Sequence, residues 1–202
     1  MGEVESYKTI DQPAVAEYKD RGSKFLAFAY PILKADDFKK WLHFLKKEHP
    51  KAAHHCFAYR IGTDGYTFRV SDDGEPAGSA GKPILGQIDS KEVTNISVIV
   101  VRYFGGSLLG VPGLINAYKT VTNFVLQLTP IVKKQIEESY ILHFDYTQIN
   151  EVMVVLKQYN CTILTQEMQL FCNITTGIPK SRITEVMYRF KELHNVEIKK
   201  LI

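Results

Sequence analysis

The chain is poor in cysteine and has no long hydrophobic run. Its three cysteines, Cys56, Cys161 and Cys172, lie far apart and form no CxxC pair. This spacing excludes a disulfide framework and a thiolate zinc site. No segment approaches the roughly 20 apolar residues of a membrane-spanning helix, and the N-terminus lacks the apolar core of a secretion signal. We therefore expect a cytoplasmic protein with no membrane contact.

The chain also has little excess charge. Its formal net charge is +3 over 202 residues, whereas dedicated nucleic-acid binders are usually far more basic. The charge permits RNA as a partner but does not require it. The most basic run comprises Lys39, Lys40, Lys46, Lys47 and Lys51 on one expected helix, and a solvated helix face is its simpler interpretation. A composition of 45% hydrophobic and 23% charged residues predicts an ordinary packed core.

The hydrophobic pattern predicts an α+β protein with two domains, residues 1–132 and 133–202. Pro130 and the charged residues around it break the pattern between them. In the first domain we expect strands within 7–32 and at 54–61, 66–70 and 96–101, and helices at 36–48, 82–88 and 112–128. The second domain has the ferredoxin-like order strand, helix, strand, strand, helix, strand, over 139–146, 148–159, 162–167, 169–175, 180–193 and 196–201.

Two Gly-rich segments are the strongest candidates for a functional site. They read SDDGEPAGSAGKPIL (71–85) and RYFGGSLLGVPGL (102–114), and each joins an expected strand to an expected helix. Glycine allows a ligand to approach the main chain closely, and free N–H groups at a helix start favour an anion. We predict a surface that binds an anion or nucleic acid, formed by Arg102, Tyr103, Phe104, Gly105, Gly106, Lys82, Gly78 and Lys24. The alternative is that the glycines only serve tight turns and that Arg102 pairs with Asp72 or Asp73.

An acidic turn offers a second interpretation. Asp72, Asp73 and Glu75, joined by His55, would form the site of a small-molecule hydrolase that holds a divalent cation. Adjacent strand residues point to opposite faces, so only one of His54 and His55 could join such a cluster. The simpler interpretation is that both aspartates cap backbone N–H groups.

Motifs for catalysis or nucleotide binding are absent from the sequence. It contains no GxxxxGK[ST], GxGxxG, HExxH or GxSxG pattern. We therefore expect no catalytic residue, metal or cofactor. A protein-interaction module without any ligand remains a further alternative.

Several motifs in order resemble a known family. RGSKFLAFAYPI, HPKAAHHCFAYRIG, SDDGEPAGSAGKPIL and TNISVIVVRYFGGSLLGVPGLINAY follow one another within residues 15–128. This arrangement resembles the IMPACT family in its bacterial YigZ-type branch. The resemblance implies an N-terminal domain like domain IV of elongation factor G, with a ribosomal-protein-type β-α-β fold. It also implies a ferredoxin-like C-terminal domain like domain V of that factor.

The resemblance also carries functional implications. The elongation-factor domains contact ribosomal RNA, and eukaryotic family members regulate translation. With the Gly-rich loops, this leads us to expect a non-enzymatic, monomeric regulator associated with translation. It would bind RNA or a ribosomal surface through the loops of its N-terminal domain, without sequence-specific binding of DNA.

Overall fold

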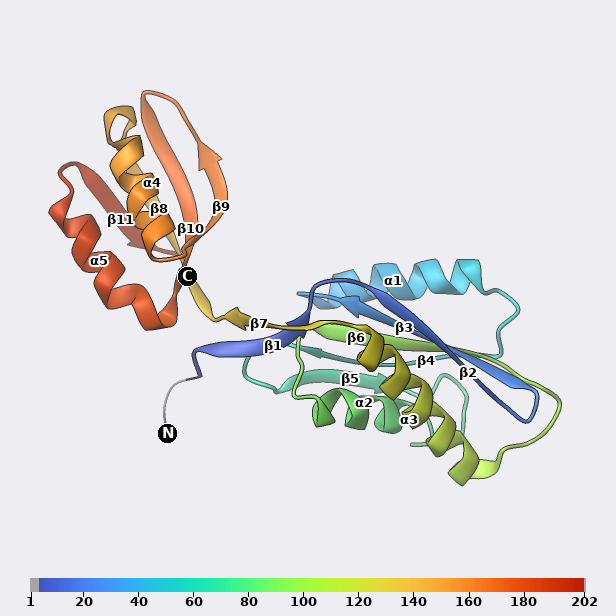
Figure 1. Cartoon of the computed structure of the whole chain (residues 1–202). Coiled ribbons are helices and arrows are strands. Elements are labelled where there is room, and N and C mark those ends of the chain that lie inside the picture. Colours follow the sequence, from blue (N-terminus) through green and yellow to red (C-terminus); the bar gives the residue numbers. More distant parts are fainter. Residues whose placement is uncertain (1–3, 202) are drawn as a thin grey trace. The chain divides into compact units, whose positions relative to one another are not determined.

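The computed structural model describes residues 4–201, which form two compact units (Figure 1). The first unit spans Tyr7–Lys134, and the second consists mainly of the residues from Gln135 onward. Each unit combines helices with an antiparallel sheet, so the protein is α+β. No helix among residues 4–201 is both long and apolar enough to cross a membrane.

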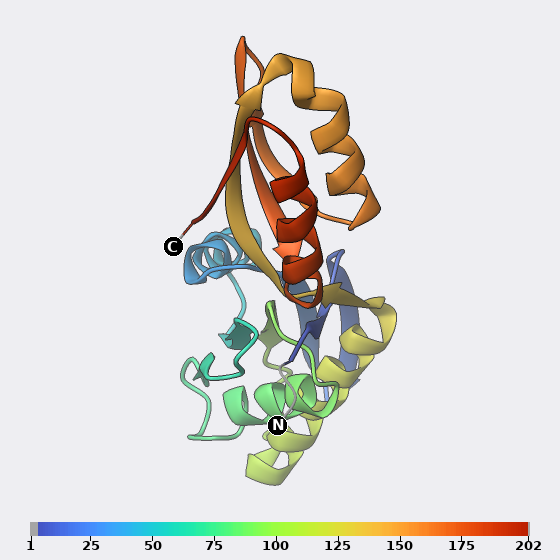
Figure 2. The ribbon, with the colours of Figure 1, turned by 90° about the vertical axis from the view of Figure 1, so that its left-hand side faces the viewer.

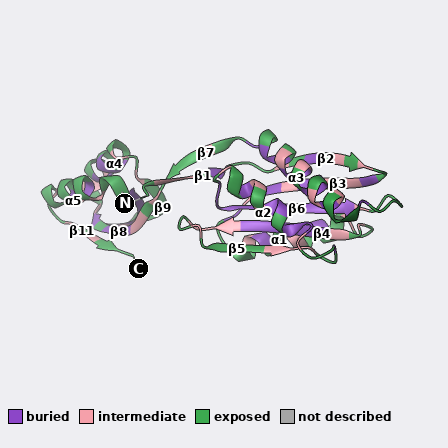
Figure 3. Ribbon diagram, turned by 90° about the horizontal axis from the view of Figure 1, so that it is seen from below, coloured by how far each residue is buried: buried purple, intermediate pink, exposed green. Residues whose placement is uncertain are grey.

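The N-terminal unit is built on a five-stranded antiparallel sheet with the order β2-β3-β6-β4-β5. Its strands are β2 (Ala14–Asp20), β3 (Ser23–Pro31), β4 (His54–Ile61), β5 (Thr67–Ser71) and β6 (Ile96–Tyr103). The central strand β6 is buried along nearly its whole length (Figure 3). Because it is apolar on both faces, both faces of the sheet must be covered by helices.

Three helices provide this cover. Helix α1 (Ala35–Glu48) lies on one face, and α2 (Gly81–Ser90) and α3 (Gly110–Leu128) lie on the other (Figure 1). Alternation along β6 sends Val98 and Val100 towards α2 and α3, and Ile99 and Val101 towards α1. The same alternation turns the next residue, Arg102, towards α2 and α3.

A short strand lies where the sequence predicted only a break between domains. Strand β7 (Ile131–Gln135) pairs with β1 (Ser6–Ile10) in a two-stranded sheet. Its sequence, IVKKQ, lacks the alternation that marks a half-buried strand, and most of its residues are exposed. Its pairing depends on β1, more than a hundred residues away, so local sequence carried no signal for it.

The C-terminal unit contains a four-stranded sheet with the order β11-β8-β10-β9. Its elements are β8 (Glu137–Asp145), α4 (Ile149–Gln158), β9 (Thr162–Glu167), β10 (Phe171–Pro179), α5 (Ile183–Glu192) and β11 (Val196–Lys200), with 3₁₀ turns at Tyr146–Gln148 and Lys180–Arg182. Both helices pack on the same face of the sheet (Figure 2). The first and third strands are central, which is the ferredoxin-like arrangement that the sequence predicted.

Candidate functional site

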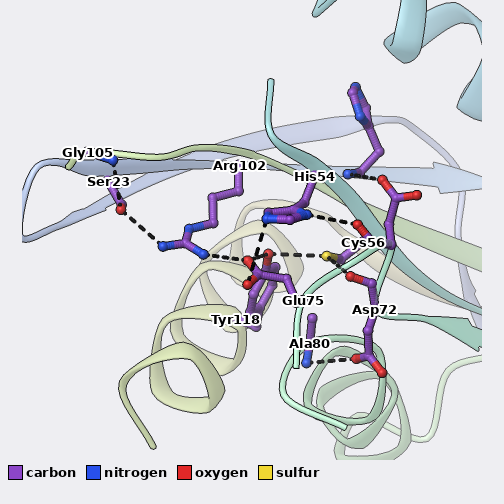
Figure 4. Close-up of polar contacts among 11 residues, drawn as sticks. Ser23, His54, Cys56, Asp72, Glu75, Ala80, Arg102, Gly105 and Tyr118 are labelled. Atoms are coloured by element: carbon purple, nitrogen blue, oxygen red, sulfur yellow. Dashed lines mark hydrogen bonds and ion pairs between the residues drawn. The ribbon is translucent and has the colours of Figure 1, made fainter. Parts of the chain in front are cut away.

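The two Gly-rich segments meet at one end of the five-stranded sheet. Cross-strand pairing places Arg102 of β6 between His54 of β4 and Phe25 of β3, with all three side chains on the face towards α2 and α3. The segment between β5 and α2 then brings Glu75 against Arg102 (Figure 4). Residues from four separate parts of the chain therefore contribute to one buried polar cluster.

A buried ion pair is the centre of this cluster. Arg102 Nη1 lies 2.6 Å from Glu75 Oε1, and the two side chains are 5% and 3% exposed. The Tyr118 hydroxyl donates to the same carboxylate oxygen at 2.8 Å, and Arg102 Nη2 donates to Ser23 Oγ at 3.3 Å. The guanidinium thus has its counter-charge inside the protein, and an external anion would have to compete with Glu75 for it.

The partner of Arg102 differs from the one considered in the sequence. The alternative that Arg102 pairs with Asp72 or Asp73 is wrong, because Glu75 is the residue of the turn that points inward. The guanidinium also lies against two rings, 5.3 Å from the centroid of Phe25 and 5.6 Å from that of Phe104. Phe104, the first residue of the exposed loop, therefore lies over the guanidinium of Arg102.

The start of α2 already holds an anion supplied by the chain itself. The carboxylate of Asp72 accepts N–H groups from Gly78 at 2.8 Å and Gly81 at 2.8 Å. It also accepts the N–H group of Ala80 at 3.0 Å (Figure 4). Burial opposes ionisation of Asp72, but the three N–H donors outweigh it and lower the pKa of the carboxyl. The donors predicted to receive an external anion here are therefore occupied, while the neighbouring Lys82 remains exposed.

Asp72→Asn is expected to destabilise the protein by about 1 kcal/mol at neutral pH, because the amide cannot replace a charged acceptor of three N–H groups. The folded-state pKa of Asp72 is depressed. Its stabilisation is therefore complete above the unfolded carboxyl pKa of about 3.9, and is lost as the pH falls through the folded value. Urea denaturation of both proteins over an acid pH series measures the difference. A difference that is constant down to the lowest pH would contradict this assignment.

Gly105 and Gly106 have different structural roles. A Cβ on Gly105 would overlap the backbone of Gly22 and Ser23, so this glycine permits the loop to touch the β2–β3 turn. Its N–H donates to Ser23 Oγ at 3.2 Å and is not free for a ligand. Gly106 has a φ of +86° and open space around its Cβ position. No motif in the sequence indicated that Ser23 Oγ would contact both Arg102 and Gly105.

The exposed part of this end carries aromatic, aliphatic and basic side chains. Phe104 is 50% exposed and Leu108 is 84% exposed. Arg21 lies exposed in the β2–β3 turn, and the Lys24 side chain is 40% exposed with Glu17 2.8 Å away. Tyr103 instead faces α1, where its hydroxyl is hydrogen-bonded to His49 Nδ1 at 2.9 Å. Among the predicted site residues, Phe104, Gly106, Lys24 and Lys82 are thus accessible to a partner.

The acidic residues point in different directions. Asp73 Oδ2 accepts the backbone N–H of His55 at 2.6 Å, whereas Asp72 caps α2 and Glu75 holds Arg102. The histidine that faces Glu75 is His54, with Nε2 3.9 Å from Oε2, and not His55 as the hydrolase hypothesis had it. His55 lies on the α1 side, where burial lowers its pKa. Within residues 4–201, no three His, Cys, Asp or Glu side chains are placed to hold a metal ion.

Cys56 is fully buried beside the ion pair. Its Sγ lies 3.2 Å from the Tyr118 hydroxyl and 3.0 Å from the Asp72 carbonyl oxygen. Burial raises the pKa of the Cys56 thiol and of the Tyr118 hydroxyl. Both groups therefore stay protonated at neutral pH, and neither has the character of an activated nucleophile.

The site lies within a segment shared with known proteins. The model of the Impact N-terminal domain matches residues 21–126, which include both Gly-rich segments. The chain belongs to the IMPACT family. This confirms the resemblance carried by the motifs.

Related IMPACT sequences match most of the chain, and a solved structure is similar to nearly all of it. An IMPACT family member from Haemophilus influenzae is 36% identical over 179 residues, covering 88% of this chain and 87% of that protein. The IMPACT family member YigZ of Escherichia coli is 32% identical over 184 residues, covering 90% of each. A crystal structure of a hypothetical protein is 29% identical, covers 99% of both chains and has a TM-score of 0.76.

Proposed function

We propose that this IMPACT family protein is a non-enzymatic, translation-associated regulator whose N-terminal domain binds RNA on a ribosomal surface. The binding surface would be the exposed end of the sheet formed by Arg21, Lys24, Phe104, Gly106 and Leu108, which we call the tip surface. The association with translation rests on the family resemblance. The choice of surface rests on the geometry of the loops.

The main support for the proposal is the contact between the β2–β3 turn and the loop after β6. The close approach of Gly105 to Gly22, with Ser23 Oγ bonded to both Gly105 and Arg102, joins the β2–β3 turn to the loop after β6. Arg21 and Lys24, in and beside the turn, and the Phe104 ring of the loop are thereby held at the same end of the sheet. RNA-binding proteins use these two kinds of group, cations for phosphates and aromatic faces for unstacked bases.

The geometry favours binding over hydrolysis. Asp72, Asp73 and Glu75 are each engaged in contacts that stabilise the loops. Cys56, the thiol of the cluster, is kept protonated by burial. These groups lie beneath the exposed loops and support them. Their structural contacts explain why carboxylates and a thiol gather here, and no catalytic role is needed.

The proposal is tested by neutralising the tip surface in the full chain with Arg21→Gln/Lys24→Gln. Binding of single-stranded RNA and of purified ribosomes should weaken roughly tenfold at low salt. The slope of log K against log salt should become less steep by about 0.7 for each phosphate that the variant no longer neutralises. Fluorescence anisotropy over a salt series measures both quantities for RNA, and co-sedimentation measures ribosome binding. Lys8→Gln/Lys91→Gln, at the opposite end of the sheet, is the matched control and should bind as the wild type does.

Two results would overturn the proposal. One is wild-type protein that binds neither RNA nor ribosomes at low salt. The other is capture of a protein partner that survives nuclease and high salt, which would identify a protein-interaction module that uses the exposed Leu108 and its neighbours.

A further inference from the structure

Helix α1 and its flanks carry the excess positive charge of the whole chain. Residues 34–51 contain six lysines and three carboxylates, a formal charge of +3. The complete chain also has a formal charge of +3, so all other residues together sum to zero. A protein that needed charge only for solubility would not have to gather its surplus in one segment.

The lysines of this helix differ in their partners. Lys39 is paired with Asp36 at 2.8 Å, and Lys46 lies 3.8 Å from Asp73. Lys40 and Lys47 are exposed, and among residues 4–201 neither has a carboxylate within ion-pair distance. The pattern leaves two uncompensated cations on the outward face of the helix.

An exposed aromatic ring lies between these two cations. Phe44 follows Lys40 by four residues and precedes Lys47 by three, so the three share one stripe of the helix. Its side chain is 48% exposed. The ring meets Trp41 edge-on, with centroids 6.2 Å apart at 86°, and Trp41 stacks on Tyr30 of the sheet at 4.1 Å. Phe44 is thus supported from the core side while part of its ring faces solvent.

The stripe is on the same side of the sheet as part of the tip surface. Lys24 pairs with Tyr103 across β3 and β6, so the two side chains share the face that α1 covers. The hydrogen bond between His49 and Tyr103 fixes the end of α1 at the end of the sheet where the tip surface begins. Lys47 lies in the last turn of α1 and is therefore near that end.

We propose that Lys40, Phe44 and Lys47 extend the tip surface into a binding track for single-stranded RNA. This inference rests on the proposed function and names the form of its ligand. The two lysines contact phosphates about 10 Å apart along the helix, and Phe44 stacks on an unpaired base between them. A duplex keeps its bases stacked inside and offers nothing to Phe44. An acidic protein segment would use the charges but not the ring.

Two variants of the full chain separate charge from stacking. Lys40→Gln/Lys47→Gln should weaken binding of a mixed-sequence single-stranded RNA and reduce the salt slope by about 1.4, because two phosphates are no longer neutralised. Phe44→Leu keeps an apolar side chain without the aromatic face. It should weaken binding roughly tenfold and leave the slope unchanged. Lys157→Gln/Lys191→Gln removes two exposed lysines from α4 and α5 and is the matched control, expected to retain wild-type binding. Thermal unfolding of each variant checks that the fold is intact.

The outcomes distinguish this inference from the proposed function. If the α1 variants bind as the wild type does while Arg21→Gln/Lys24→Gln loses binding, the track is refuted and the tip surface stands. If Lys157→Gln/Lys191→Gln weakens RNA binding by the same factor as Lys40→Gln/Lys47→Gln, the effect is a nonspecific loss of charge and the track is refuted. Equal affinity for a blunt RNA duplex, unchanged binding by Phe44→Leu, or equally tight binding of polyglutamate would each refute single-stranded RNA as the ligand. Absence of all RNA binding would remove both proposals.

Discussion

Replacing Arg102 by leucine is expected to lower the free energy of unfolding by about 3–5 kcal/mol. The reason is the environment of the partner that remains. The Glu75 side chain is 3% exposed, and without Arg102 its carboxylate keeps, among residues 4–201, only the Tyr118 hydroxyl within hydrogen-bond distance, with His54 Nε2 farther away at 3.9 Å. A buried charge without a counter-ion is far more costly than the loss of an exposed pair, which contributes about 0–1 kcal/mol. Urea denaturation at neutral pH measures the change.

A double substitution shows whether this cost comes from the unpaired charge. Arg102→Leu/Glu75→Leu removes both ions and should recover much of the stability lost in the single variant. A matched surface pair is Lys8 and Glu92, which lie 2.7 Å apart and are largely exposed. Lys8→Leu should change the stability by less than about 1 kcal/mol. A single Arg102 variant as stable as this control would disprove a structural role for the buried pair.

Gly105→Ala is expected to lower the free energy of unfolding by about 3 kcal/mol, because a Cβ at this position would overlap the backbone of Gly22 and Ser23. Relief of that overlap requires the loop and the β2–β3 turn to separate. The hydrogen bond from Gly105 N–H to Ser23 Oγ would then break as well. Since the two loops together form the tip surface, RNA binding should weaken in parallel, by more than any loss of folded protein explains.

Gly106→Ala is the matched control for this substitution. Gly106 has a φ of +86° but no neighbour within 4 Å of its Cβ position. Alanine there is disfavoured only by the left-handed backbone, which costs about 1–2 kcal/mol. Chemical denaturation compares the free energies of unfolding of Gly105→Ala and Gly106→Ala, and fluorescence anisotropy compares their affinities for RNA. If Gly106→Ala is the more damaging of the two, the contact between the loops is not what holds the tip surface.

The sequence predicted a binding surface formed by the two Gly-rich segments, but it did not show which of their groups contact one another. Glycines, a cation and aromatics at two strand-to-helix junctions led to that prediction, and the structure brings both segments to one end of the five-stranded sheet. The prediction treated Arg102, Gly105 and the α2 N–H groups as free for a ligand, and the structure gives them partners in Glu75, Ser23 and Asp72. Composition shows which groups can bind an anion. It does not show whether the chain supplies one.

The sequence by itself determined the elements, the α+β class and the family. Alternation of period two, helical periodicity and the positions of Gly and Pro are local properties, so nearly every strand and helix lies where they predicted. Only the tertiary structure decided that Glu75, and not Asp72, neutralises Arg102. It also decided that His54, and not His55, faces Glu75, and that β7 forms a strand. Each of these depends on strand register or on which side chain of a turn points inward, because side chains distant in the chain become neighbours only when the sheet assembles. The same assembly placed Lys24 on the face that α1 covers, and the hydrogen bond between His49 and Tyr103 holds the end of α1 beside the Gly-rich loop that follows β6.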